Sequence, residues 1–306
     1  MTQLIITNQP VLKVGTDCSG IEAPIQALRQ LAIPFHQVFS CDVDKFCQQS
    51  IKENYYCDKL YTDITTRNHA DVPDMDLYVA GWPCQAFSTA GNRQGFAHKS
   101  GNIFWHCLDV IKIKKPRYFL MENVKGLTWH DKGRTWKIIR ESLENLDDYN
   151  FHWKVLNTRD YGIPQNRERI YMVGIRKDLK QTFEWPKPVP MKPLSNFVDW
   201  DYTVQDEIRP DVIKSGMLNN IPKDAIFVDF SFKKHNYPNS GKYCPTVAAD
   251  SRLWCVPLHR YATPGERLAL QGFNSFYSGS PARQINKQAG NSMSVNVLSA
   301  ILTNLL

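Results

Sequence analysis

The stretch DLYVAGWPCQAFS, residues 76–88, decides the fold of this chain. Its first half is a short apolar run closed by glycine and proline, which predicts a buried strand that stops just before Cys84. Ligands of open α/β sheets lie at such strand ends. A cysteine held there by Pro83 and followed by the polar run 88–101 is typical of a nucleophile beneath a mobile lid. For a cysteine taken alone, a small buried hydrophobe in a turn is the alternative.

The composition is that of a globular protein with one large core and a smaller lobe. The chain has 306 residues, 42% of them hydrophobic and 22% charged. A net charge of +7 favours a polyanionic partner. The sequence has no apolar run long enough to span a bilayer, so we expect an intracellular protein without a membrane partner. Its eight cysteines form no C-x-x-C pair, which argues against zinc or any other metal and against a disulfide framework.

Apolar runs and helical periodicity alternate along the chain in the manner of a doubly wound α/β sheet. The expected strands are residues 11–16, 38–41, 61–64, 76–80, 118–121, 151–156 and 169–175. The expected helices are residues 24–33, 102–114, 264–270 and 295–305. Four prolines between residues 183 and 193 predict a stiff linker and a domain boundary, and residues 194–243 predict a small irregular lobe.

The loop after the first strand, residues 17–22, predicts a nucleotide-like ligand. It joins a strand to a helix through Gly20, and Asp42 follows Gly20 by 22 residues, close to the spacing of an acid that binds ribose hydroxyls. The chain has no G-x-G-x-x-G, so the pattern favours an adenosine without a pyrophosphate. Asp63, at the end of the third strand, is suited either to accept from an adenine amino group or to cap a turn.

Three further groups of polar residues follow strands or turns. Glu122 directly follows the strand 118–121, so we expect it at the same edge as Cys84, with a raised pKa if buried. A solvent-facing carboxylate is the alternative. If extended, Gln165, Arg167 and Arg169 would share one face and present a cationic row to a ligand or to solvent. The turn predicted at residues 290–291 offers amides to a carboxylate.

These motifs, in this order, resemble the DNA (cytosine-5)-methyltransferase family. The similarity covers most of the chain, and each motif alone would be weak. The matching segments are the nucleophile loop 80–88, Glu122-Asn123-Val124, the Gln-x-Arg-x-Arg of residues 165–169, residues 266–273 and Gly290-Asn291-Ser292.

The resemblance implies a doubly wound, mostly parallel, Rossmann-like methyltransferase sheet with a smaller irregular target-recognition domain. The catalytic domain would comprise residues 1–187 completed by 284–306, and the recognition domain with its hinge residues 188–283. The methyl donor would be S-adenosyl-L-methionine. The substrate would be a cytosine flipped out of a specific double-stranded DNA sequence.

The family's roles can be assigned to matching positions of this sequence. The catalytic residues would be Cys84, Glu122, Arg167 and Arg169. The cofactor-binding residues would be Cys18, Ser19, Gly20, Ile21, Asp42, Val43, Asp63, Ile64, Gly81, Pro83, Asn291 and Ser292. The DNA-binding residues would be Gln85, Ser88, Gln165 and Thr246.

The first loop departs from the family pattern. The family has Phe-x-Gly-x-Gly where this chain has residues 18–22, Cys-Ser-Gly-Ile-Glu. Cys18 would deprive adenine of an aromatic partner, and Glu22 would meet either the methionine ammonium or the helix N-terminus. Trp82 stands where proline or phenylalanine is commoner.

Two alternatives remain open from the sequence. One is a cytosine-5 methyltransferase of transfer RNA on the same scaffold, although the Cys-Phe-Thr signature of that branch is absent. The other is a family member that binds DNA without catalysis, although Cys84, Glu122 and both arginines are present. We expect a monomeric, stand-alone modification enzyme of a bacterium, phage or large virus, paired with a restriction endonuclease. It would lie in the cytoplasm, or in the nucleus if the source is eukaryotic.

Overall fold

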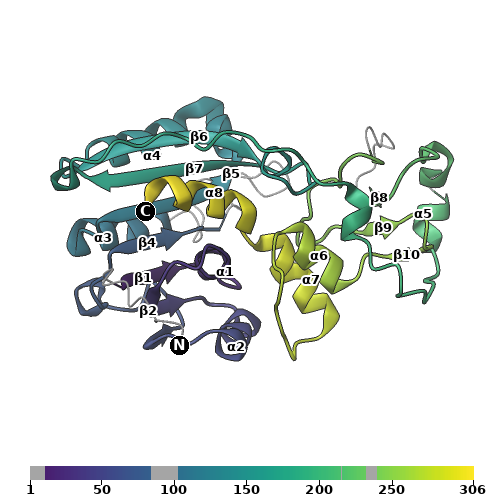
Figure 1. The fold of residues 1–306 in the computed structure, drawn as a ribbon, viewed down its shortest axis with the longest axis horizontal. Helices are drawn as coiled ribbons and strands as arrows, with labels where there is room; N and C mark the ends of the chain where they lie inside the picture. Colours follow the sequence, from purple (N-terminus) through teal and green to yellow (C-terminus); the bar gives the residue numbers. More distant parts are fainter. Residues whose placement is uncertain (1–10, 84–102, 215, 232–239) are drawn as a thin grey trace, which may run out of the picture.

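The structure is a computed structural model that describes residues 11–83, 103–214, 216–231 and 240–306. Cys84, Gln85 and Ser88 lie outside the described residues. The described part contains a seven-stranded sheet and a three-stranded sheet (Figure 1). In spatial order, the strands of the larger sheet are β3 (Lys59–Tyr61), β2 (Phe35–Cys41), β1 (Leu12–Asp17), β4 (Leu77–Ala80), β5 (Tyr118–Val124), β7 (Glu168–Arg176) and β6 (Tyr149–Asn157).

The larger sheet is doubly wound and mostly parallel, as the sequence predicts. Strands β1 to β5 pair in parallel, and β7 and β6 add an antiparallel edge. The chain runs outward from β1 through β2 to β3 and then returns to β4 on the other side of β1. The carboxyl ends of β1 and β4 therefore flank the switch point, where open α/β sheets bind their ligands.

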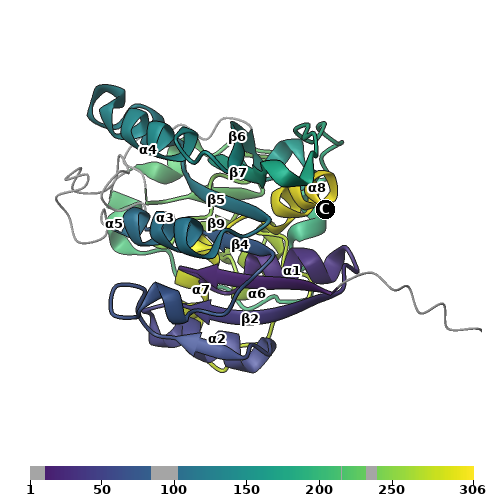
Figure 2. The same ribbon diagram turned by 90° about the vertical axis from the view of Figure 1, so that its left-hand side faces the viewer.

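Side chains alternate between two cores on opposite faces of this sheet, as strand geometry requires. Leu77 and Val79 enter the core beneath α1 (Ala23–Gln30) and α8 (Val295–Leu305), whereas Tyr78 and Ala80 enter the core beneath α3 (Ile103–Lys114) and α4 (Arg134–Glu144). Figures 1 and 2 show the two pairs of helices on opposite faces. Complete burial of an aliphatic side chain contributes about 1.5–3 kcal/mol, so α8, with six buried residues, anchors the end of the chain to the sheet.

The element boundaries follow local signals. Helix α2 (Lys45–Asn54) begins at Asp44, whose carboxylate accepts from the amide of Phe46 at 2.9 Å. Helix α1 ends at Gln30, earlier than the predicted residue 33, and Ala32 then takes a left-handed φ of 52°. The second strand begins at Phe35, three residues before the predicted start, because its first residues pair with β1.

The smaller sheet lies in the segment predicted to be an irregular lobe and just beyond it. Its strands, in the order β10-β9-β8, are β10 (Arg260–Tyr261), β9 (Leu253–Cys255) and β8 (Phe227–Asp229). Residues 194–226 form three short helices, η8 (Leu194–Phe197), α5 (Pro210–Lys214) and η9 (Met217–Asn220). Two further helices, α6 (Pro264–Leu270) and α7 (Ala282–Asn291), lead back to the large sheet. The domain limits at residues 187 and 284 remain predictions.

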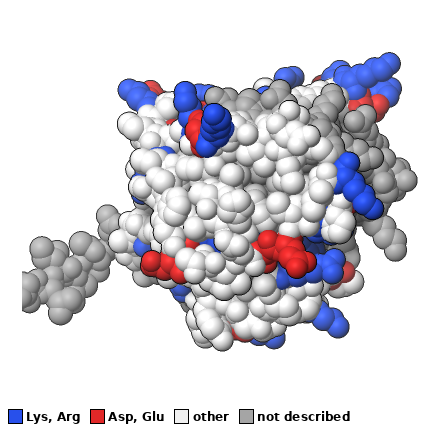
Figure 3. Space-filling view, turned by 90° about the vertical axis from the view of Figure 1, so that its right-hand side faces the viewer, with Lys and Arg blue, Asp and Glu red and all other residues white. Residues whose placement is uncertain are grey.

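The surface of this end of the molecule carries its positive charge at the edges. Figure 3 faces the end formed by β8 to β10 and α5, and its Lys and Arg side chains lie mostly near the margin. The net charge of +7 is therefore not gathered into one patch on this face of the described residues. Across the part of the chain that the structure describes, no helix combines the length and apolar character needed to cross a bilayer. Those same residues hold no cluster of three or more side chains suited to bind a metal.

A buried ion pair fixes the junction between the small sheet and α6. Arg260 and Glu266 form a two-pronged pair at 2.7 and 2.9 Å, with both side chains essentially unexposed. Glu266 also forms a capping box with Thr263, and it accepts from the amide of Asp199 at 2.9 Å. Because every oxygen of the carboxylate has a donor, the pair fixes the geometry of three segments.

We predict that Glu266→Gln lowers the free energy of unfolding by about 3–5 kcal/mol, because it leaves the charge of Arg260 buried and uncompensated. Urea denaturation measures the loss. The control is Glu141→Gln, which removes an exposed pair with Lys137 at 3.8 Å and should change stability by less than about 1 kcal/mol. Equal midpoints for the two variants would refute this account of the junction.

Candidate active site

The loop between β1 and α1 forms one wall of the site. Ser19 is tied to the next strand, because its hydroxyl accepts from the amide of Cys41 at 3.0 Å. Gly20 has a φ of 55°, a left-handed conformation that glycine adopts without strain, and open space lies over its α-carbon. The backbone of this loop is therefore held rigidly and can be approached closely by a ligand.

Asp42 is fixed directly behind that loop. Its carboxylate accepts from the amide of Gly20 at 2.8 Å and from the amide of Asp44 at 2.9 Å. Burial raises the pKa of Asp42, and the two amides oppose the rise. Carboxylate oxygens accept more than one hydrogen bond each, so Asp42 keeps acceptor capacity for a hydroxyl group.

Glu22 lies neither at a ligand surface nor free at the helix end. The side chain is fully buried. It accepts from the hydroxyl of Thr16 at 2.7 Å and from the side-chain amide of Gln37 at 2.9 Å. The residue takes a left-handed φ of 59° at the N-cap of α1. Burial raises the pKa of Glu22 from 4.5 to about 7, although hydrogen bonds from Ser40 and Thr16 limit the rise. Glu22 thus stands at the helix N-terminus, but its side chain makes no capping hydrogen bond: it faces β2 and links the loop to that strand.

Glu122 and Arg169 form the charged centre of the site. In the antiparallel register, Arg169 lies opposite Val124, which puts it diagonally across from Glu122 on the same face of the sheet. Their side chains are 11% and 14% exposed and approach to 3.3 Å between Oε1 of Glu122 and Nε of Arg169. Burial raises the pKa of Glu122, and the charges of Arg169 and Arg167 oppose the rise. The carboxyl is thus buried as predicted, and burial favours its protonated form more than in an exposed carboxyl.

Arg167 binds backbone groups. Its guanidinium donates to the carbonyl oxygens of Val247 at 2.8 Å, Ser292 at 2.6 Å and Gly290 at 3.2 Å. The side chain is 2% exposed. Three distant segments of the chain are therefore held at one point beside the site.

Gln165 is not in an exposed cationic row. Its side chain is fully buried, donates to the carbonyl of Leu270 at 2.7 Å and accepts from the amide of Val247 at 2.9 Å. Only Arg169 of the three predicted residues lies within β7. The extended row fails because residues 164–166 pair with Cys244 instead of continuing the strand. We therefore reassign Gln165 from DNA contact to joining these segments.

Residues 290–291 form a helix end and not the predicted turn. Helix α7 continues to Asn291, and a β-carbon on Gly290 would lie 2.2 Å from the amide nitrogen of Ala249. The glycine is thus required by a close approach of two backbones. Thr246, the predicted backbone contact for DNA, is partly buried and donates to the carbonyl of Asn166 at 2.6 Å.

A cavity joins these parts at the carboxyl ends of β1 and β4. The predicted residues that line it come from the first loop, the ends of β4 and β5 and the C-terminal motif: Cys18, Ser19, Gly20, Gly81, Glu122, Asn291 and Ser292. The remaining walls come from residues that sequence reasoning missed: Thr16, Asp17, Ala23, Pro24, Val79 and Met293.

Several predicted cofactor residues lie outside the lining of this cavity. Ile21 and Ile64 are buried in the two cores, and Val43 is 73% exposed. Asp63 caps a turn, because its carboxylate accepts from the amide and the hydroxyl of Thr65, both at 2.8 Å. Pro83 is half-buried at the edge of the described residues. Asp42 is not part of the lining, but its carboxylate accepts from the amide of Gly20, which is.

Asp17 is the clearest of the missed residues. Its carboxylate accepts from Arg67 at 2.6 Å and from the hydroxyl of Tyr78 at 2.8 Å, and it is almost fully buried. The Arg67 guanidinium also lies over the rings of Phe39 and Tyr61, at 5.1 and 4.9 Å from their centroids. The position of Asp17 directly after the predicted strand 11–16 was the available signal, and the observed strand β1 includes it. Its partner is 50 residues away.

Comparisons with known proteins agree with this geometry. The sequence model of the C-5 cytosine-specific DNA methylase family matches residues 17–306. The chain is 40% identical over 272 residues to Type II methyltransferase M.HaeII of Haemophilus aegyptius, covering 86% of this chain and 84% of that protein. It is 37% identical over 269 residues to Type II methyltransferase M.NgoBI of Neisseria gonorrhoeae, covering 86% and 84%. The crystal structure of the S. pombe Dnmt2 methyltransferase superposes with a TM-score of 0.71 at 22% identity, covering 96% of this chain and 98% of that one.

The doubly wound sheet with a cavity at its switch point is the fold of Rossmann-like methyltransferases. With the family match over nearly the whole chain, the protein belongs to the C-5 cytosine-specific DNA methylase family. The resemblance drawn from the five motifs is thereby confirmed.

The raised pKa of Glu22 predicts a pH-dependent stability. Between pH 4.5 and about 7 the unfolded chain loses this proton while the folded protein keeps it, so folding becomes less favourable as pH rises through that window. We expect Glu22→Gln, which cannot ionise, to gain stability relative to the parent from pH 5 to pH 8, by up to about 3 kcal/mol. Urea unfolding at a series of pH values measures the difference. The stability of the exposed control Glu141→Gln should change with pH as that of the parent does. The same pH dependence in Glu22→Gln would contradict the raised pKa of Glu22.

Proposed function

We propose that this enzyme transfers a methyl group from S-adenosyl-L-methionine to C5 of a cytosine flipped out of a specific double-stranded DNA sequence, through a covalent bond between Cys84 and C6. The observation that carries the proposal is the buried pair of Glu122 and Arg169 beside the cavity at the switch point. A cytosine ring presents N3 and O2 on one edge, and these are the atoms that a protonated carboxyl and a guanidinium can bind.

The residues present suit the donor. Asp42, fixed by two amides, retains acceptor capacity for ribose hydroxyls. The open backbone at Gly20 and the polar groups of Ser19, Asn291 and Ser292 suit the methionine end. S-adenosyl-L-methionine supplies an electrophilic methyl group on a positively charged sulfur.

The protein groups would then act on the cytosine. C5 is a poor nucleophile, so addition of the Cys84 thiolate at C6 is needed to create an enamine whose C5 is reactive. Glu122 near N3 offsets the charge that develops during addition, and Arg169 stabilises the O2 side. Arg167 supports this arrangement through the backbone. A water molecule takes the C5 proton before the bond to Cys84 breaks.

The preference for DNA over transfer RNA follows from the sequence relatives. The two relatives described above are Type II methyltransferases. We propose in addition that the enzyme is a monomer and is paired with a cognate restriction endonuclease. The likeness to S. pombe Dnmt2, at 22% identity, shows the fold alone.

Tritium transfer from labelled S-adenosyl-L-methionine tests the substrate. We expect label in duplex DNA and none above background in bulk transfer RNA, and Glu122→Gln should lower the rate on DNA by about 100-fold or more because it removes a proton donor. Bisulfite sequencing of the labelled DNA then gives the target sequence. Labelling of transfer RNA alone would overturn the choice of substrate.

A covalent trap tests the role of Cys84. Duplex DNA in which cytosine is replaced by 5-fluorocytosine should capture the enzyme as a complex stable to detergent, because fluorine cannot leave C5 as a proton does. We expect Cys84→Ala to abolish the complex while DNA binding remains. The control Cys57→Ala, a half-buried cysteine outside the cavity lining, should trap as the parent does. Trapping by Cys84→Ala would exclude the proposed attack.

A further inference from the structure

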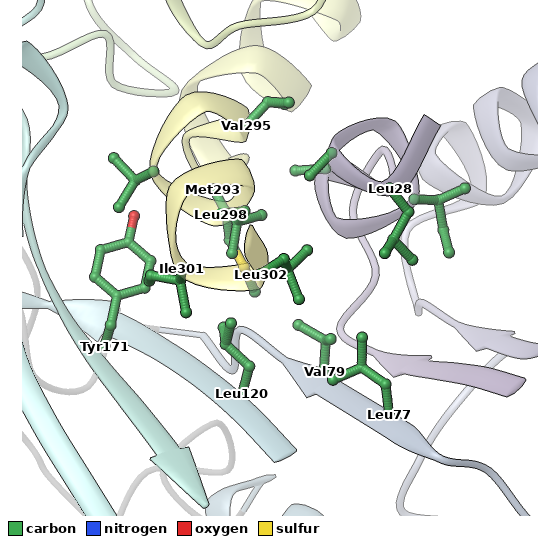
Figure 4. Close-up of a cluster of buried hydrophobic side chains, with 14 of the residues drawn as sticks. Leu28, Leu77, Val79, Leu120, Tyr171, Met293, Val295, Leu298, Ile301 and Leu302 are labelled. Carbon is green, nitrogen blue, oxygen red and sulfur yellow. The ribbon is translucent and has the colours of Figure 1, made fainter. Parts of the chain in front are cut away.

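Tyr171 is a buried titratable side chain that the proposed reaction does not use. It lies in β7, is 1% exposed and packs in the core beneath α8, where its ring lies beside Ile301 and its hydroxyl points away from the sheet (Figure 4). Among the described residues, no group forms a hydrogen bond with this hydroxyl. A phenylalanine would fill the same space without burying a polar group, so the hydroxyl needs a partner that offsets its burial.

The register of the sheet places Tyr171 next to Glu122. The two residues lie directly opposite each other in the antiparallel pair of β5 and β7, so their side chains leave the same face with β-carbons about 4.5–5.5 Å apart. Oε1 of Glu122 is also buried and has no hydrogen bond within the described part of the chain, although it lies 3.3 Å from Nε of Arg169. Two buried polar atoms in need of a partner therefore belong to neighbouring side chains.

The charges around Tyr171 agree with this placement. Burial raises the pKa of its phenol, the negative charge of Glu122 raises it further, and nearby arginines oppose the rise. The charged and titratable groups that act on the phenol are Glu122, Arg167, Arg169 and Tyr161. Helix α8, which covers this face, has no titratable side chain. The phenol therefore keeps its proton and is available as a donor toward the carboxylate.

We propose that Tyr171 is a positioning residue for Glu122: its hydroxyl donates to one bound water molecule, which donates to the carboxylate. Buried polar groups without a protein partner commonly bind an ordered water molecule, and such a bridge is nearly as favourable as a direct hydrogen bond. The bridge adds a second contact to the one with Arg169, so the carboxyl keeps one orientation toward N3 of the cytosine. The role in catalysis rests on the proposed function, whereas the bridge is tested by itself.

A pH titration of the Glu122 carboxyl, followed by carbon-13 NMR without DNA or cofactor, tests the bridge. Glu122→Gln identifies the signal. Tyr171→Phe removes a donor from the ionised carboxyl, so we expect the pKa of Glu122 to rise by roughly 0.5 to 1. Methyl transfer to DNA is measured in parallel. Its kcat should fall by about fivefold, the effect of one hydrogen bond, and the KM for DNA should stay the same because the hydroxyl acts only through Glu122.

The matched control is Tyr118→Phe. Tyr118 belongs to β5 and to the same core, but its hydroxyl donates to Gln181 at 2.8 Å. Its loss should leave the pKa of Glu122 and the kcat unchanged. An unchanged pKa in Tyr171→Phe, or an equal rise in Tyr118→Phe, would overturn the inference.

A second variant keeps the test decisive if Tyr171→Phe does not fold. With 3-fluorotyrosine at position 171, the phenol is more acidic and donates more strongly, so the pKa of Glu122 should fall below that of the parent. A pKa equal to that of the parent would then overturn the bridge.

The two measurements separate the two levels of the argument. If Tyr171→Phe raises the pKa of Glu122 but the parent transfers no methyl group, the bridge stands and the proposed function is refuted. If the parent transfers methyl to DNA and Tyr171→Phe has the same pKa and kcat, only the role of Tyr171 is refuted. A raised pKa with an unchanged kcat would overturn its role in catalysis.

Discussion

The guanidinium of Arg167 is the interaction on which the site depends. It donates to carbonyl oxygens at positions 247, 290 and 292, so it joins the segment around Val247 to the C-terminal motif. Gln165, two residues earlier, binds the same segment at Val247 and the end of α6 at Leu270. Backbone carbonyls buried away from water need donors, and a guanidinium with five N–H groups can satisfy several at once. Ser292 follows Arg167 by 125 residues in the chain, yet the one side chain of Arg167 holds these segments together.

This arrangement explains why the catalytic candidates come from such different elements. Glu122 is fixed by a parallel strand, and Arg169 by the antiparallel strand beside it, so their relative position is set by strand register. The C-terminal motif is fixed by Arg167 and by α8, which packs against the same sheet. Each group therefore sits on a regular element or is bonded to one, which favours catalysis because little reorganisation is needed during the reaction.

The sequence predicts the large sheet well and the contacts between distant segments poorly. Apolar runs such as 76–80 and 118–121 mark buried strands because periodicity is local. The three-stranded sheet was not predicted, since strands of two or three residues are too short to show a period. The sequence also predicts Glu122 at the sheet edge that carries the nucleophile loop 80–88, and Glu122 lines the cavity together with Gly81 of that loop.

The residues that were misplaced have partners far away in the chain. Gln165 was expected to be exposed from its spacing, but its burial depends on residues 247 and 270. Gly290 was read as a turn, whereas the glycine serves an approach to the backbone of residues 248 and 249. Nothing local distinguishes these cases, since glycine is used both for turns and for close packing.

The first loop shows how this chain departs from its family without losing the site. Where the family has a second glycine, Glu22 adopts the same left-handed region that glycine would, at a steric cost that needs compensation. The compensation is a network in which Thr16 and Gln37 both donate to its carboxyl. That network ties β1 to β2 directly beneath Ser19 and Gly20, so a side chain supplies the rigidity of the loop. The side chain of Glu22 therefore lies outside the cavity lining, in the hydrogen bonds that hold the loop in place.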